Sequence, residues 1–285
     1  MKTLNKENVM KMVFFLAALT SVIAVALICV FLFAGGVPAM MKIGLREFLF
    51  GQIWKPGNNL YGIFPMILGS ICVTAVSLAI GVPIGLFCSV FMAAYCPKKI
   101  YNVCRAAINL MAGVPSIVYG FFGLVLVVPL MNDLTGEDGS TMLSASIILA
   151  IMILPTIIAQ AETSIRSVPD HYYEGSLALG ATKERSIFRV VFPAAKSGII
   201  AGVVLGIGRA IGETMAVIMI AGNQPRMPKG LFKGIRTLTA NIVIEMGYAE
   251  GLHREALIAT GVVLFVFILI INLIVSILNR RVTHE

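Results

Sequence analysis

The sequence is poor in charge: only 13% of its 285 residues are Asp, Glu, Lys or Arg, whereas 58% are hydrophobic. Soluble globular domains usually carry about 25% charged residues. This shortage excludes an ordinary soluble protein and predicts one that crosses a membrane several times. The net charge of +8 does not indicate a nucleic-acid partner, because the basic residues fall mostly in the loops between apolar runs.

Several chemical motifs are also missing. No G-x-x-x-x-G-K-[ST] run occurs, so the chain has no phosphate-binding loop for ATP of its own. The five cysteines are odd in number and lack a C-x-x-C spacing, and the three histidines are scattered, so we expect neither disulfides nor a metal site. The sequence therefore predicts no catalytic residue, no metal and no cofactor bound by this chain, and the chain is not expected to be an enzyme.

Six apolar runs are long enough to cross a bilayer core of about 30 Å. They are predicted at about 12–34, 65–95, 106–131, 142–165, 195–221 and 256–279. The first run follows three lysines, and a cleaved signal peptide is the alternative. At roughly 23 residues it exceeds the usual signal core of about 7–15 residues, which favours a retained span. The predicted fold class is all-α, a polytopic membrane protein with about six transmembrane helices surrounded by membrane lipid.

The distribution of positive charge predicts the orientation. Most of the 22 Lys and Arg residues lie on the same side of the predicted spans as the N-terminus, and the short loop 131–141 carries acids but no base. The positive-inside rule therefore places both termini and the segment 166–196 in the cytoplasm. Trp54 and Tyr61, in the first external loop, are interpreted as anchors at the membrane interface.

The segment 166–196 is a polar interruption between two apolar runs, and it is predicted to form two short helices. Ser167 is expected to cap the first helix, with Pro169 in its opening turn. Gly180 supplies the left-handed residue that ends this helix, and Thr182 can cap the second. Such a charged helix pair on a membrane face is a surface suited to docking.

Seven positions in this segment follow a known spacing. They are Glu174, Gly175, Ser176, Gly180, Val190, Phe192 and Pro193. The spacing resembles the EAA loop of ABC-importer permeases, which inserts into a groove on a separate ATPase. The resemblance implies that these residues form an ATPase coupling loop and that ATP and Mg²⁺ are bound by that partner ATPase. The alternative is an ordinary helix–turn–helix between two spans.

The predicted fifth span contains two charged residues, Arg209 and Glu213. Their spacing of four places them on one helix face, where they can pair. A charge at bilayer depth costs about 2.5–3.5 kcal/mol, so both should face the bundle interior or water. Either they form a structural ion pair, or they line the substrate pathway, with Arg209 meeting an oxyanion while Glu213 holds it. The neighbouring glycines are predicted to allow close helix approach: Gly206, Gly208 and Gly212.

Four further segments resemble the phosphate-specific ABC permeases of the C type (PstC-like). They read GVPSIVYGFFG (113–123), GRAIGETMAV (208–217), AGN (221–223) and RTLTANI (236–242). With the coupling loop, the resemblance covers most of the chain from about residue 65 onward. It implies the type I ABC importer permease fold and a location in the inner (plasma) membrane of a prokaryote.

The resemblance also implies partners. These are a second permease subunit (PstA-like) in a heterodimer, two copies of an ABC ATPase (PstB-like) and an extracytoplasmic phosphate-binding protein (PstS-like). Residues 1–64 are expected to form a cytoplasmic segment, the first span and an external loop, and 65–285 the permease domain. The expected function is import of inorganic phosphate by alternating access after delivery from the binding protein.

Three alternatives remain at this point. The nearest is an ABC permease for another oxyanion or small solute, because the coupling loop is shared across substrates. A secondary transporter would show inverted repeats and ion-coordinating acids, and no convincing repeat is found. A non-transporting scaffold is the third. The basic external loop 222–254 is either solvated, or a docking surface, or an entrance that concentrates anions.

Overall fold

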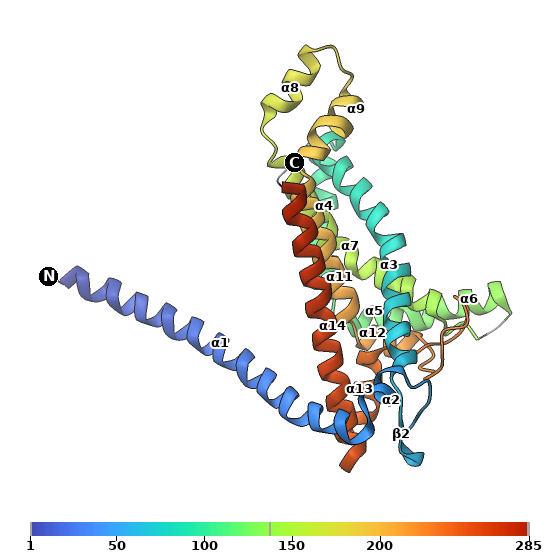
Figure 1. Cartoon of the computed structure of the whole chain (residues 1–285). Coiled ribbons are helices and arrows are strands. Elements are labelled where there is room, and N and C mark those ends of the chain that lie inside the picture. Colours follow the sequence, from blue (N-terminus) through green and yellow to red (C-terminus); the bar gives the residue numbers. More distant parts are fainter. Residues whose placement is uncertain (1, 137, 284–285) are drawn as a thin grey trace.

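The computed structural model describes residues 2–136 and 138–283. Long helices form a bundle, two short helices protrude from one end of it, and a small hairpin lies at the other end (Figure 1). The long helices are α1 (Lys2–Ile43), α3 (Phe64–Val90), α7 (Met142–Arg166), α11 (Lys196–Gly212) and α14 (Gly251–Thr283). The all-α prediction is confirmed. Residues 1, 284 and 285, whose cytoplasmic placement the sequence predicts, lie outside the described residues.

The remaining elements connect the long helices. Between α1 and α3 lie α2 (Leu45–Phe50), β1 (Trp54–Lys55), η1 (Pro56–Asn58) and β2 (Leu60–Tyr61). Between α3 and α7 lie η2 (Phe91–Tyr95), α4 (Lys98–Gly113), α5 (Ser116–Phe122), η3 (Gly123–Val127) and α6 (Val128–Thr135). After α7 come α8 (Asp170–Ala178), α9 (Lys183–Ser186), η4 (Ile187–Val191) and α10 (Phe192–Ala194), and after α11 come α12 (Met215–Ile220) and α13 (Leu238–Met246).

In the described chain, five helices are long and apolar enough to cross a membrane, or six if the bent pair Lys183–Ala194 and Lys196–Gly212 counts as one span. Helices α3, α7 and α14 confirm the predicted second, fourth and sixth spans. Helix α1 is longer than predicted, and its side chains from residue 7 to 28 are exposed. Figure 1 shows α1 extending away from the bundle and meeting it only at its C-terminal end.

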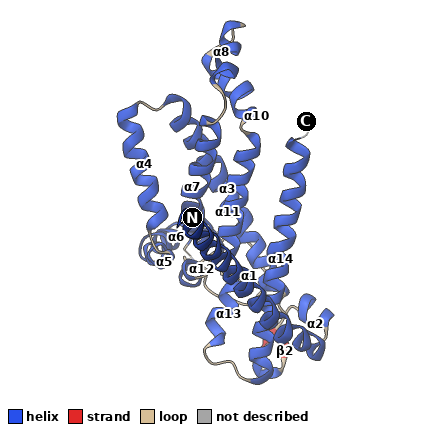
Figure 2. Ribbon diagram, turned by 90° about the vertical axis from the view of Figure 1, so that its left-hand side faces the viewer, coloured by secondary structure: helices blue, strands red, loops and turns tan. Residues whose placement is uncertain are grey.

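The predicted third span, 106–131, is wrong in its boundaries. The helix breaks at Val114 and Pro115, and the apolar stretch suited to a span runs from Ser116 to Thr135. Proline has no backbone N–H and disfavours a helical conformation at the preceding residue, so Val114 is extended, with ψ 126°. The preceding helix α4 lies beside α7 (Figure 2).

Helix α7 is the centre of the bundle. Of its apolar stretch, 67% is buried within the chain, against 28% or less in the other unbroken candidate spans. Glycines bring its neighbours close: a Cβ at Gly85 of α3 would lie 2.9 Å from Ile157, and one at Gly206 of α11 would lie 3.0 Å from the same side chain. Helices α3 and α11 therefore pack closely against α7.

The hairpin end forms a second packed region. Trp54 and Tyr61 face each other across β1 and β2 and are 5% and 3% exposed, so the interpretation of both as interfacial anchors is wrong. Their rings meet edge to face, and Trp54 Nε1 donates a hydrogen bond of 2.8 Å to Glu245 Oε2 of α13. Burial raises the pKa of Tyr61. Glu245, which lies far from Trp54 in the sequence, thus satisfies the indole N–H and allows the tryptophan to be buried.

We predict that Gly69→Ala destabilises the protein. A Cβ at Gly69 would lie 2.4 Å from the backbone oxygen of Arg236, and backbone cannot move aside as a flexible side chain can. The expected cost is about 1–3 kcal/mol, which exceeds the helix-propensity gain of alanine. A thermal unfolding measurement in detergent checks it, with Gly57→Ala as control because a Cβ there meets nothing within 4 Å. Equal midpoints for the two variants would contradict the packing.

Candidate functional site

The predicted coupling loop forms two short helices, α8 and α9, at the end of the bundle farthest from the hairpin (Figure 1). Gly180 separates them with φ +85°, a left-handed conformation that strains other residues. Thr182 caps α9, since its Oγ1 accepts a hydrogen bond of 3.3 Å from the Arg185 amide. The two-helix prediction, the left-handed glycine and the threonine cap are confirmed.

The predicted Ser167 cap is wrong. Pro169 occupies the N-cap position of α8 and makes no side-chain cap bond. Ser167 instead ends α7, where its Oγ donates to the Ser164 carbonyl at 2.9 Å. Because Pro169 disfavours a helical conformation at Val168, the new helix starts only after the proline.

The seven predicted coupling residues fall into two groups. At the tip, Glu174 and Gly175 are exposed on α8, and Ser176 Oγ accepts a hydrogen bond of 2.9 Å from Ser186 Oγ, which ties α8 to the end of α9. Val190, Phe192 and Pro193 lie at the root, in η4 and α10, before a bend of 70° into α11.

The coupling loop also exposes large apolar side chains, two at α8 and one in η4. Leu179 is 91% exposed, Tyr172 48% and Phe188 46%. Exposed apolar groups clustered on a structured loop are typical of a surface that another protein covers. The geometry of this loop is therefore that of a docking element.

The predicted fifth span is broken, and this corrects the expected Arg209–Glu213 pair. Glu213 is extended, with φ −67° and ψ 133°, so the two residues do not share a helix face. Arg209 Nη1 lies 3.4 Å from Thr156 Oγ1 of α7, while Glu213 Oε1 accepts a hydrogen bond of 3.2 Å from the Ala216 amide in the first turn of α12. The carbonyl of Glu213, freed by the break, accepts one of 3.0 Å from Thr239 Oγ1.

The glycines around Arg209 differ in their surroundings. Gly206 packs on α7 as predicted. For Gly208 and Gly212, a Cβ would meet nothing within 4 Å, so the prediction that they allow close approach within this chain is wrong. In the described chain, Arg209 thus lies between two open glycine positions and takes part in no ion pair. Such a guanidinium is available to an anion.

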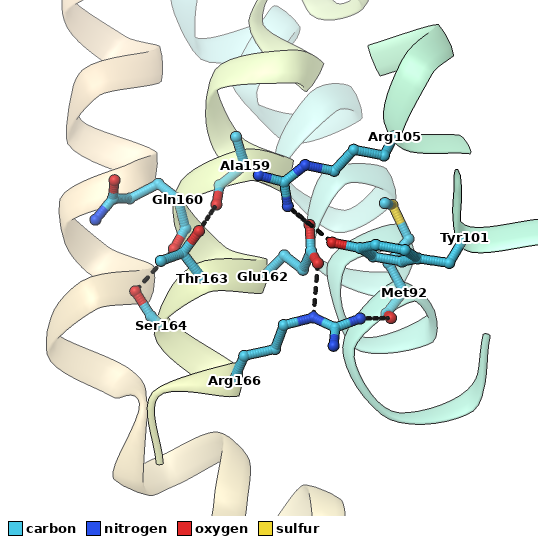
Figure 3. Close-up of polar contacts among 9 residues, drawn as sticks. All are labelled: Met92, Tyr101, Arg105, Ala159, Gln160, Glu162, Thr163, Ser164 and Arg166. Carbon is cyan, nitrogen blue, oxygen red and sulfur yellow. Dashed lines mark hydrogen bonds and ion pairs between the residues drawn. The ribbon is translucent and has the colours of Figure 1, made fainter. Parts of the chain in front are cut away.

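One cluster that the sequence reasoning missed lies where α7 meets the coupling loop (Figure 3). Glu162 is 1% exposed, and its two carboxylate oxygens pair with Arg166 at 2.7 Å and Arg105 at 3.0 Å. The Glu162–Arg166 spacing of four is a signal that the sequence does carry. Arg105 lies 57 residues away and gives no such signal.

A second missed cluster lies at the hairpin end. Glu245 is 5% exposed and pairs with Arg236, and its Oε2 lies 2.8 Å from His253 Nε2 in addition to the bond from Trp54. Helix α13, which supplies Glu245, is capped by Thr237, whose Oγ1 accepts a hydrogen bond of 3.2 Å from the Ala240 amide. This cluster fixes α13, and with it the Thr239 hydroxyl that meets the broken helix.

Comparison with known proteins identifies similar chains. The family described as binding-protein-dependent transport system inner membrane component matches residues 81–284. A probable ABC transporter permease protein YqgH of Bacillus subtilis is 35% identical over 278 residues, covering 95% of this chain and 90% of that protein. The phosphate transport system permease protein PstC of Mesorhizobium japonicum is 32% identical, and the match covers 93% of this chain and 88% of that protein. The PstC protein of Haemophilus influenzae is also 32% identical, and the match covers 96% of this chain and 92% of that protein.

Solved structures share the fold. A chain of the inward-facing MetNI methionine ABC transporter has a TM-score of 0.62 at 21% identity, covering 81% of this chain and 99% of its own. A chain of a bacterial ABC transporter for the acidic polysaccharide alginate has a TM-score of 0.60 at 14% identity, and the match covers 93% of this chain and 96% of that chain. These likenesses show a common fold.

We predict that Glu213 acts structurally as a cap for α12. Glu213→Ala should lower the free energy of unfolding by about 0.5–2 kcal/mol, because the Ala216 amide loses its acceptor in a setting with little water. Glu213→Gln keeps a carbonyl oxygen at that place and should retain nearly all of the stability. Thermal unfolding of the two variants in detergent compares them. Equal losses would show that the charge, and not the cap, stabilises the break.

Proposed function

Since this chain belongs to the family of inner membrane components of binding-protein-dependent transport systems, we propose that it is the subunit through which inorganic phosphate crosses the membrane. It is the permease subunit of an ABC importer, which works with an ATPase and a binding protein, and it is not itself the catalytic subunit. The choice of phosphate rests on the PstC relatives and on the position of one arginine.

Arg209 is the observation that carries the proposal. It lies at the end of α11, immediately before the break, with no acidic partner in the described chain and an open glycine position on either side. An unpaired guanidinium at membrane depth costs several kcal/mol, and a passing anion compensates for that cost while it is bound. The planar fork of donors matches the oxygens of phosphate better than an ammonium group does.

The coupling loop supports the second part of the proposal. Its exposed apolar tip, carrying Glu174 and Gly175, docks on an ATPase that binds ATP and Mg²⁺. Closure of two ATPase copies (PstB-like) then moves the loop, and the root at Val190, Phe192 and Pro193 passes the movement to α11. ATP biases the transport cycle only by the difference in how the ATPases hold the loop in each state.

The full assembly that we propose contains a second permease subunit (PstA-like) and a phosphate-binding protein (PstS-like). The second subunit completes the pathway opposite the open glycines, and the binding protein delivers phosphate at the hairpin end. Both termini and the coupling loop then lie in the cytoplasm, in agreement with the distribution of Lys and Arg. In this organisation residues 65–285 form the permease domain, and 1–64 add the first span and the external hairpin.

We predict that Arg209→Ala strongly lowers phosphate uptake while assembly and ATP hydrolysis persist. Loss of a charge-assisted contact should lower uptake by about 10- to 100-fold. Uptake by Arg209→Lys should lie between that of the wild type and that of Arg209→Ala, because a point charge replaces the planar fork of guanidinium donors. Uptake of radiolabelled phosphate into proteoliposomes holding the complete complex and internal ATP measures this. Lys99→Ala, which removes an exposed positive charge from α4, is the control.

Two results would overturn these assignments. Normal uptake by Arg209→Ala would remove the arginine from the pathway. An intact complex that hydrolyses ATP but moves no phosphate would leave the permease role standing and assign another oxyanion or small solute. Competition by arsenate, sulfate or molybdate separates the oxyanions.

We further predict that Gly180→Asp leaves the protein inserted but uncouples it. A side chain at φ +85° costs about 1–2 kcal/mol and shifts α8 relative to α9, so the tip no longer fits its partner. Co-purification of the ATPase should weaken and uptake should fall in parallel. Gly136→Asp is the matched control, because Gly136 has φ +67° but lies at the end of α6, away from the coupling loop. A Gly180→Asp variant that retains both activities would contradict the coupling role.

A further inference from the structure

A buried carboxylate joins α7 to α4 at the base of the coupling loop, and one of its arginine partners reaches η2 at the end of α3 (Figure 3). Glu162 of α7 is 1% exposed, whereas the two arginines that hold it, Arg105 and Arg166, are each 44% exposed. The close-up shows the two guanidinium groups reaching the carboxylate from opposite sides. Both oxygens of Glu162 are therefore paired, one to Arg105 of α4 and the other to Arg166 of its own helix, α7.

Arg166 connects this carboxylate to α3. Its Nη2 donates a hydrogen bond of 2.7 Å to the Met92 carbonyl in η2, where the helix is locally π-helical. Its guanidinium also lies 4.5 Å from the ring centre of Tyr101 in α4. Arg166 is the last residue of α7, and the next residue starts the coupling loop. A displacement of the loop thus acts directly on this side chain.

Arg105 continues the connection along α4. Its Nη1 is bonded to Glu162 at 3.0 Å and also donates to the Tyr101 hydroxyl at 2.9 Å. Near the other end of the same helix, the Met111 carbonyl accepts a hydrogen bond of 2.8 Å from the Tyr119 hydroxyl of α5. Helix α4 is therefore attached by side chains at both ends.

Helix α5 lies against the short helix that follows the break. A Cβ at Gly120 would lie 2.9 Å from Ala216 and 2.8 Å from the sulfur of Met219, so α5 and α12 are in close contact. Ala216 is the residue whose amide is capped by Glu213. The side-chain contacts thus run from the coupling loop through α4 and α5 to the broken helix that carries Arg209.

We propose that Glu162 is a positioning residue that passes movement of the coupling loop to α4 and so to the pathway. This inference rests on the proposed function of the loop. The carboxylate holds Arg166 and Arg105 together as one unit, so α4 follows the base of the loop. Without the carboxylate, the two guanidinium groups repel each other, and α4 no longer follows. Buried ion pairs contribute little net stability compared with apolar packing, so stability alone does not explain this one.

The test compares transport with hydrolysis in the complete complex in proteoliposomes. Glu162→Gln should lower phosphate uptake by roughly tenfold, the size of effect that a changed coupling energy between sites produces, while ATP hydrolysis stays within about twofold. Glu255→Gln is the matched control, because it removes a carboxylate from an ion pair with Lys42 that is exposed on both sides. Unchanged uptake in Glu162→Gln, or losses of uptake and hydrolysis in equal proportion, would overturn the proposal.

A second variant decides the question if Glu162→Gln does not assemble. Arg105→Gln removes a side chain that is 44% exposed and leaves the Glu162–Arg166 pair, so it should fold and show the same separation of uptake from hydrolysis. Lys99→Gln removes a charge from an exposed position on the same helix and should leave both activities unchanged. Full uptake in Arg105→Gln would overturn the proposal.

The route through α4 has its own test. Tyr119→Phe removes only the hydroxyl that bonds to Met111, and the double variant with Arg105→Gln should lose no more uptake than the worse single variant, because both changes interrupt one connection. Losses that multiply would show that the two contacts act separately and would overturn the route.

A distance measurement keeps this inference separate from the choice of substrate. Spin labels at Val103→Cys on α4 and Met41→Cys on α1, both exposed positions outside the coupling loop, are placed in a variant lacking the native cysteines. ATP with vanadate should change their separation in the complex, and Arg105→Gln should abolish the change even if phosphate is not the substrate. No change in the parent complex, or the same change in the variant, would overturn the proposal.

Discussion

In the core of a bilayer, a backbone carbonyl or amide without a partner costs several kcal/mol, and this constraint explains which polar residues occur where the helices of this protein break. At the break after α11, Thr239 supplies a donor to the Glu213 carbonyl and the Glu213 side chain accepts from the Ala216 amide. At η2, where the helical register shifts, Arg166 supplies a donor to the Met92 carbonyl. At both of these places a side chain from a distant part of the chain donates to a backbone carbonyl.

These partners are themselves fixed by buried carboxylates near the two ends of the bundle. Glu162 orients Arg166, and Glu245 anchors α13, the helix that presents Thr239. A carboxylate with several donors resists displacement, because removing one partner leaves a buried charge uncompensated. The protein therefore has two rigid polar clusters and, between them, a broken helix whose open glycines face away from the rest of the chain.

The sequence predicts what depends on local chemistry and fails where the partner is distant. Gly180 and Thr182 are predictable, because a left-handed glycine and a threonine cap act within a few residues. The break at Glu213 contains no proline, and the hydroxyl that stabilises it comes from Thr239, so the periodicity of 195–221 predicts one continuous helix. The local sequence around Trp54 predicts an interfacial position, because the acceptor that holds the side chain inside, Glu245, lies 191 residues away. The roles of Arg209 and of the coupling residues stay predictions.

Under the function that we propose, the position of Arg209 along α11 sets how much movement the coupling loop must deliver. Helix α11 starts after the 70° bend and reaches Arg209 13 positions beyond Lys196, which corresponds to about 20 Å at a rise of about 1.5 Å per residue. A tilt of about 10° at the bend then displaces Arg209 by roughly 3.5 Å, more than the length of a hydrogen bond. Gly202 and Gly206 place no side chain between α11 and α7 where the two helices meet, so α11 can tilt there without a side-chain clash. Under this proposal, a modest closure of the ATPases would be sufficient to make or break the contact between Arg209 and an anion, with α4 and α5 moving together with α11.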